Sequence, residues 1–103
     1  MKNFKSYYAV IFTSTQNDDI VGYSEMAKKM ETLAKQQKGF LGIDSARNEV
    51  GITISYWKTP DDIKNWKANF DHLMAQKLGK EQWYRWYKVR ICKVEREYEF
   101  HND

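Results

Sequence analysis

Apolar side chains occupy both faces of the first element that the hydrophobic pattern predicts, a strand over residues 6–15. Successive side chains of a strand point to opposite faces, so each face collects every second residue. One face carries Tyr8, Val10 and Phe12, and the other carries Tyr7, Ala9 and Ile11. A strand that is apolar on both faces is covered on both sides in the folded protein.

Two amphipathic helices are predicted where apolar residues recur every three or four positions. The first begins near Asp18 and Asp19 and ends before Gly39. The second begins at residues 59–62 (TPDD) and ends near Gly79. A threonine cap, a proline at the first helical position and early carboxylates are typical of a helix start. The apolar stripes are Tyr23, Met26, Ala27, Met30, Leu33 and Ala34 in the first helix, and Ile63, Trp66, Phe70, Leu73 and Met74 in the second.

Three further strands complete the predicted sheet. Residues 40–47 and 50–58 form a hairpin, because the two residues between them, Asn48 and Glu49, favour a tight turn. Residues 80–86 predict a short helical turn, followed by a last strand over 87–98 and a frayed tail at 99–103. The order β-α-β-β-α-β predicts the α+β class with a ferredoxin-like arrangement, in a single domain over residues 1–103.

The ferredoxin-like arrangement places both helices on one face of the sheet and leaves the other face bare. The last strand repeats the two-sided pattern of the first, with Val89 and Ile91 on one face and Cys92 and Val94 on the other. An exposed apolar sheet promotes aggregation unless a partner covers it. We therefore expect a homodimer in which two sheets pair face to face.

Composition adds one signal to this picture. Aromatic residues make up 16% of the 103 residues, which is more than a core of this size obviously requires. The surplus indicates a second buried surface, either a subunit interface or a pocket for a flat ligand. The 17 basic and 14 acidic residues are interspersed, so they form no stripe that would bind a polyanion.

Other classes of protein are disfavoured by what the sequence lacks. No run approaches 18 apolar residues and the first ten residues contain no signal-peptide block, so we expect no membrane span and no export. A single cysteine, Cys92, excludes an intramolecular disulfide, and a cytoplasmic location is expected. Gly42 and Ser45 stand where an RNA-binding module of this topology requires stacking aromatics, so nucleic-acid binding is not expected. Phosphate-loop, metal-ligand and nucleophile-elbow motifs are also missing, so no metal, flavin or other bound cofactor is expected.

Several sequence segments resemble those of one protein family. GITISYW at 51–57, DDIKNWKANFDHLMAQ at 61–76, and WYRWY with the following KVEREY are similar to the antibiotic biosynthesis monooxygenase-like family, especially its small uncharacterised bacterial members. The resemblance covers nearly the whole chain and implies a dimeric α+β barrel. It implies activities such as cofactor-independent oxygenation of phenolic polyketides, quinol oxidation and haem degradation. Some members have no demonstrated chemistry, so the resemblance predicts the fold more specifically than the function.

Two residues are candidates for catalysis. Trp66 lies on the inner stripe of the second helix, where it would form a wall of an aromatic pocket or pack between helix and sheet. His72 is the histidine outside the tail and roughly matches one that the family often carries in this region. It falls on the solvent side of the helical wheel, so it would act as a base only if the helix broke near Asn69.

Four residues are candidates for binding a substrate: Tyr23, Asn69, Trp83 and Tyr87. Tyr23 would supply a hydroxyl, and Asn69 would reach the pocket rim or remain solvated. Trp83 and Tyr87 share a face of the predicted short helix at i and i+4, as a lid over the pocket or as packing at its mouth.

These residues support two functions. The first is a cofactor-independent monooxygenase or oxidase of a planar phenolic or quinone-like molecule, which needs a dry aromatic pocket and donors for a developing oxyanion. The alternative is a noncatalytic dimer that binds such a molecule. Haem degradation fits less well, because haem-degrading relatives carry an iron-ligating histidine ten residues beyond the helix tryptophan. Counted from Trp66, that position is Gln76.

Overall fold

The computed structural model describes residues 4–77 and 82–102 of the chain, and the side chains of residues 75–77 lie outside that description. The described residues form four strands and two helices: β1 (Tyr7–Gln16), α1 (Tyr23–Lys35), β2 (Phe40–Arg47), β3 (Gly51–Trp57), α2 (Pro60–Lys77) and β4 (Tyr84–Val94). The predicted order of elements and the α+β class are therefore confirmed.

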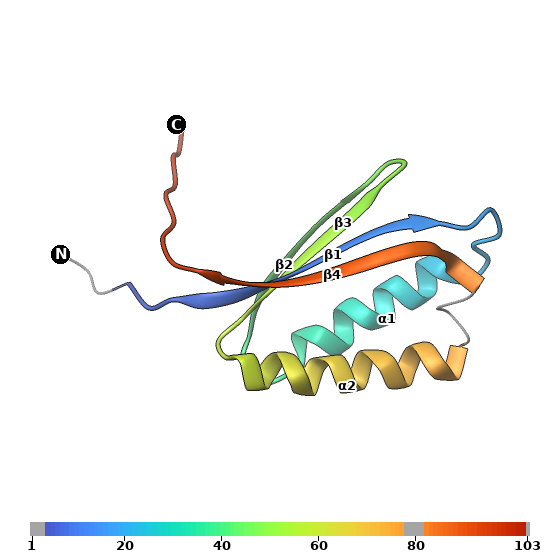
Figure 1. The fold of residues 1–103 in the computed structure, drawn as a ribbon, viewed down its shortest axis with the longest axis horizontal. Coiled ribbons are helices and arrows are strands. Elements are labelled where there is room, and N and C mark those ends of the chain that lie inside the picture. The colour runs from blue at the N-terminus through green and yellow to red at the C-terminus, as the bar shows by residue number, and fades with distance from the viewer. Residues whose placement is uncertain (1–3, 78–81, 103) are drawn as a thin grey trace.

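The strands form one antiparallel sheet in the order β2-β3-β1-β4. Both helices lie on the same side of this sheet, as Figure 1 shows. The helices pack nearest to the hairpin formed by β2 and β3, with α1 against β2 and α2 against β3. The β4 edge is therefore the less covered half of the sheet.

The side chains of β1 are divided between the two faces as the sequence predicts. Phe12 faces the helices and pairs with Thr53 of β3 and Val89 of β4. Its neighbour Ile11 lies on the opposite face, which we call the outer face, and pairs with Ile54. No element of the described chain covers the outer face, which is the bare sheet surface expected of this arrangement (Figure 1).

The first helix begins later than predicted, at Tyr23 rather than near Asp18 and Asp19. Asp19 instead accepts a hydrogen bond from the backbone N–H of Val21 at 3.1 Å and forms a turn. Gly22 then caps the helix with φ of +86°, a left-handed conformation that favours glycine. The second helix begins as predicted, with the Thr59 hydroxyl accepting the backbone N–H of Asp62 at 3.1 Å.

The predicted helical turn over 80–86 is wrong in its second half. Tyr84, Arg85 and Trp86 already belong to β4, which pairs with β1 from Gln16 onward, and the strand ends at Val94 rather than at residue 98. Lys80 and Glu81 lie outside the described residues. Strand pairing across the sheet outweighs the local helical spacing of the aromatic residues here.

The start of β4 is fixed by contacts with the loop before α1. The backbone N–H of Asn17 donates to the carbonyl of Trp83 at 2.9 Å, and its side chain donates to the carbonyls of Gln82 and Tyr84. The indole N–H of Trp83 donates to the carbonyl of Val21 at 2.8 Å. Trp83 is thereby buried against Met26 and Met74 at this end of the core. None of the helices in the described residues is long and apolar enough to cross a membrane.

Candidate functional site

A cavity of about 710 Å³ lies between the helix-facing side of the sheet and the two helices. Its size is within the range of small-molecule sites, which is roughly 300–1,000 Å³. Val89 and Ile91 of β4 line it and are 44% and 58% exposed, so the cavity is accessible along the β4 edge. A molecule can therefore reach the space between sheet and helices without a change in the fold.

Aromatic rings form the wall of the cavity. The ring of Phe12 stacks on Tyr87, with centroids 5.0 Å apart and planes inclined by 24°. Phe70 of α2 contacts Phe12 edge to face at 5.7 Å, and Trp66 continues the row at 6.3 Å from Phe70. These four rings line the cavity and present faces and edges on which a planar ligand can pack.

The end of the cavity nearest the β2–β3 turn is polar. Arg47, the last residue of β2, extends across Gly51 of β3 and donates a hydrogen bond from Nη2 to the hydroxyl of Ser14 on β1. Its guanidinium also lies 5.8 Å from the centre of the Tyr23 ring, a cation–π contact. Arg47 and Tyr23 both line the cavity, so positive charge and a phenol hydroxyl meet at one end of it.

Tyr84 completes this polar end. Burial, the nearby Tyr23 hydroxyl and a hydrogen bond between the two phenols raise the pKa of Tyr84 above its ordinary value, although the charge of Arg47 opposes the rise. The phenol of Tyr84 is therefore held in its protonated form and serves as a hydrogen-bond donor rather than as a base.

The residues predicted as site residues divide into two groups. Trp66, Tyr23 and Tyr87 line the cavity. Trp83 does not line it and is buried in the core, where its indole N–H bonds the loop before α1. Because it belongs to the core, Trp83 closes the end of the helical layer instead of contacting a ligand.

Asn69 and His72 lie outside the cavity. Asn69 is exposed and donates hydrogen bonds to the side chain of Gln37 at 3.2 Å and to the carbonyl of Asn65 at 3.0 Å. His72 is exposed, and α2 runs unbroken from Pro60 to Lys77. The helix break that would turn His72 toward the cavity is absent, so its position does not support a role as a base.

Two residues of the polar end of the cavity, Arg47 and Tyr84, were not identified as site residues from the sequence. Arg47 sits beside a predicted turn, where a charged residue is ordinarily solvated. The signal that could have identified it is the glycine at 51, which the hairpin register places directly across from Arg47. Tyr84 falls in the predicted helical turn over 80–86, so the sequence did not indicate that it is the first residue of β4.

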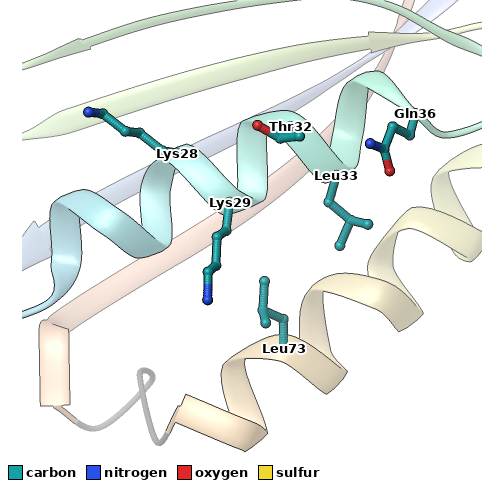
Figure 2. A pocket seen from close by; sticks show the side chains of 6 residues that line it. All are labelled: Lys28, Lys29, Thr32, Leu33, Gln36 and Leu73. Carbon is teal, nitrogen blue, oxygen red and sulfur yellow. The ribbon is translucent and has the colours of Figure 1, made fainter.

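A second hollow lies between α1 and α2 and is separate from the cavity under the sheet. Figure 2 shows Leu33 of α1 and Leu73 of α2 pointing toward one another across it, with Lys29 extending toward α2. Its volume is about 400 Å³, and its other lining residues are Lys28, Thr32 and Gln36. It has no aromatic ring, so the larger cavity under the sheet is the better candidate site. Among the described residues, no three histidine, cysteine, aspartate or glutamate side chains are grouped so as to bind a metal ion.

Comparison with known proteins adds one sequence relative. The chain is 44% identical over 93 residues to the uncharacterized protein YqjZ of Bacillus subtilis (strain 168), which covers 88% of this chain and 82% of YqjZ. No protein-family model matches the chain.

Solved structures with the same fold are more distant in sequence. The chain superimposes with a TM-score of 0.72 on a mutant of SnoaB, a cofactor-independent oxygenase from Streptomyces nogalater, at 10% identity over 91% of this chain and 97% of SnoaB. A Nitrosomonas europaea protein named as a candidate antibiotic biosynthesis monooxygenase matches with a TM-score of 0.69 and 13% identity, over 92% of this chain and 95% of that protein. At such identities the likeness concerns the fold alone.

Proposed function

Because the chain belongs to the same family as YqjZ and has the fold of the antibiotic biosynthesis monooxygenase-like proteins, we propose that it oxidises a planar phenolic or quinol-type molecule with dioxygen and without a bound cofactor. The observation that carries this proposal is the accessible cavity of about 710 Å³, which combines a row of aromatic rings with a cation and phenol hydroxyls at one end. SnoaB, which is a cofactor-independent oxygenase, has the same fold.

The proposed chemistry uses the electrons of the substrate itself. An electron-rich substrate such as an anthrone loses a proton, and its anion passes one electron to dioxygen. The substrate radical and superoxide combine to form a peroxide, and loss of water then leaves a carbonyl where the CH₂ group was. The balance is one CH₂ group and one O₂ giving one C=O group and one H₂O.

In this reaction the protein positions the substrate and stabilises its negative charge. Trp66, Phe70 and Phe12 would hold the planar rings and exclude water from them. Tyr84 and Tyr23 share one hydrogen bond, so one O–H remains between the two phenols. That O–H would donate to the developing oxyanion, in the way that preorganised donors stabilise charge in a transition state. No histidine is among the described residues that line the cavity. The proton lost by the substrate would therefore be accepted by a carboxylate at the rim of the cavity or by water.

The experiment is oxygen uptake by the purified protein with a panel of dihydroxyaromatics and anthrones. Trp66→Ala and Tyr84→Phe should each lower kcat/KM by at least about tenfold, because one removes ring contacts and the other disrupts the phenol pair that supplies the oxyanion donor. The matched control is Arg85→Gln, whose ion pair with Asp18 at 3.5 Å lies outside the cavity lining.

His72→Ala tests the base role suggested by the sequence, and unchanged uptake would remove His72 from the mechanism. Oxygen uptake that survives Trp66→Ala and Tyr84→Phe together would mean autoxidation in solution and would refute the proposal.

A second candidate function is noncatalytic binding of the same class of molecule. It is favoured by the chemistry of the polar end, where Tyr84 stays protonated near neutral pH because its pKa is raised, so it is not available to accept a proton from a ligand. Tight binding of a panel member without oxygen uptake would select this function.

We also propose that the working form is a homodimer in the cytoplasm. Support for the dimer comes from the outer face of the sheet, where Ile11 and Ile54 form a cross-strand pair and Cys92 is exposed. A single cysteine suits a reducing compartment.

A further inference from the structure

We infer that the Arg47 end of the cavity binds an anionic oxygen of the ligand, so that the ligand is a planar aromatic molecule bearing a carboxylate or an ionised phenol. This inference rests on the proposed function only in taking the cavity as the ligand site. It specifies which end of the ligand enters which end of the cavity.

The first step is the way in which the sheet presents Arg47. Arg47, Gly51, Ser14 and Tyr87 occupy one row across all four strands, in the order β2, β3, β1 and β4. A Cβ atom at position 51 would overlap Cζ and Nη2 of the guanidinium, so only glycine leaves room for Arg47 to cross β3. Ser14, which accepts its hydrogen bond, is 0% exposed. The arginine is thus tethered over the sheet by a buried partner while Arg47 itself remains exposed to the cavity.

The second step concerns the charges around the cavity. Among the residues that the structure describes, two carboxylates line it, and each is already paired with a lysine: Asp71 with Lys67, and Glu31 with Lys35 at 3.2 Å. Within residues 4–77 and 82–102, Arg47 forms no ion pair with a carboxylate. A guanidinium that is fixed in place without an anionic partner favours a ligand that brings one.

The third step is the surrounding chemistry. The guanidinium has five N–H donors, of which Nη2 already donates to Ser14, so other donors remain for an anionic oxygen. Tyr84 and Tyr23 line the same end, and the charge of Arg47 acts on the phenol of Tyr84. The rings of Phe12 and Phe70 lie farther along the strands from this row, toward Trp66. An acidic aromatic molecule would therefore place its oxygen at Arg47 and its rings along this aromatic wall.

The test compares two probes of the same shape, 2-naphthoate and 2-naphthamide, by isothermal titration calorimetry. The protein should bind the charged naphthoate about tenfold more tightly than the neutral naphthamide, as expected for one charge-assisted contact. Arg47→Gln should abolish this preference, because it weakens naphthoate binding far more than naphthamide binding. Gly51→Ala should reduce the preference, because it displaces the guanidinium without removing the charge. Lys28→Gln is the matched control, since Lys28 also lines the cavity but lacks the tether to Ser14.

A third probe distinguishes the two kinds of anion. If ionised phenols are bound, the apparent pKa of 2-naphthol should fall on binding to the parent protein and not on binding to Arg47→Gln. Preference for naphthoate without this fall would restrict the ligand to carboxylates.

Equal affinity for naphthoate and naphthamide, or an equal loss of preference in Lys28→Gln and Arg47→Gln, would overturn the inference. Failure of both probes to bind would overturn it as well. A clear preference for naphthoate together with no oxygen uptake from any panel compound would instead refute the oxygenase proposal and leave the anion site standing.

Discussion

The indole ring of Trp66 on α2 stacks on that of Trp57 on β3, with centroids 5.9 Å apart and planes inclined by 23°. Trp57 is fully buried, whereas Trp66 is half-buried and lines the cavity. One face of Trp66 thus belongs to the contact between helix and sheet, while the residue also forms part of the candidate site. Both roles that the sequence suggested for Trp66 are compatible with this position.

The first prediction separates these two roles. Trp66→Ala should lower the free energy of unfolding by about 3 kcal/mol, because it removes a large ring from the contact with Trp57. It should also weaken 2-naphthamide binding several-fold. Urea unfolding and calorimetry measure the two effects. Phe100→Ala is the control, since Phe100 is 84% exposed in the tail and does not line the cavity, and its cost should stay below about 1 kcal/mol. Lost stability with unchanged probe affinity would assign Trp66 to packing alone.

The second prediction follows from the raised pKa of Tyr84. A tyrosine in the unfolded chain ionises near pH 10, whereas Tyr84 in the folded protein keeps its proton to higher pH. Its contribution to stability is therefore present below pH 10 and is lost as the pH rises toward the folded pKa, at up to about 1.4 kcal/mol per pH unit.

Tyr84→Phe should make the decline in the free energy of unfolding between pH 10 and 11 shallower, as measured by urea titration at several pH values. Loss of the hydrogen bond to Tyr23 would lower the free energy of unfolding by the same amount at every pH below 10, so the slope of the curve against pH would not change there. Tyr98→Phe is the comparison, because Tyr98 is 85% exposed in the tail. Parallel curves for Tyr84→Phe and the parent protein would contradict the prediction.

The third prediction concerns the outer face. Sedimentation equilibrium at micromolar concentration should give about 25 kDa, twice the chain mass of 12.4 kDa. Ile54→Lys should shift the equilibrium toward monomer, because it puts a charge at the cross-strand pair with Ile11. Lys64→Gln, on the exposed side of α2, should leave the mass unchanged. A parent protein that remains monomeric would rule out face-to-face pairing.

The fourth prediction is that haem is not degraded. Gln76 stands ten residues beyond Trp66, where haem-degrading relatives have the iron-ligating histidine, and an amide is a poor iron ligand. His72 is exposed on an unbroken helix, so it is a poor substitute. Titration with haemin should give weak, nonspecific binding and no ascorbate-dependent bleaching. A sharp Soret shift at one haem per chain that His72→Ala abolishes would prove this wrong.

Much of the fold follows from short-range patterns. The two-sided first strand, the hairpin strand over residues 40–47 and the capped start at Thr59 all depend on residues close to one another in the chain. The position of His72 also followed from the helical wheel, because α2 is regular over its whole length. Local periodicity is sufficient wherever an element is long and continuous.

The misplaced element ends have a common physical cause. The late start of α1 and the early start of β4 both depend on hydrogen bonds between Asn17 or Val21 and residues 82–84, more than sixty positions away. Locally, Asp18 and Asp19 favour a helix start and the aromatic residues at 83–87 match a helical face. The pairing with β1 and the burial of Trp83 outweigh both preferences.

The sequence by itself determined the order of elements, the two apolar faces of the sheet and the aromatic residues available for a pocket, because side-chain periodicity records which face each residue must occupy. Only the tertiary structure decided which polar groups meet at the cavity. Arg47, Ser14 and Tyr84 come from three different strands. The sheet order β2-β3-β1-β4 aligns Arg47 with Ser14 across Gly51, which leaves the space between them, and Tyr84 pairs with Gln16, two residues beyond Ser14. That alignment depends on strand register and on a missing side chain, and neither leaves a periodic signal along the chain.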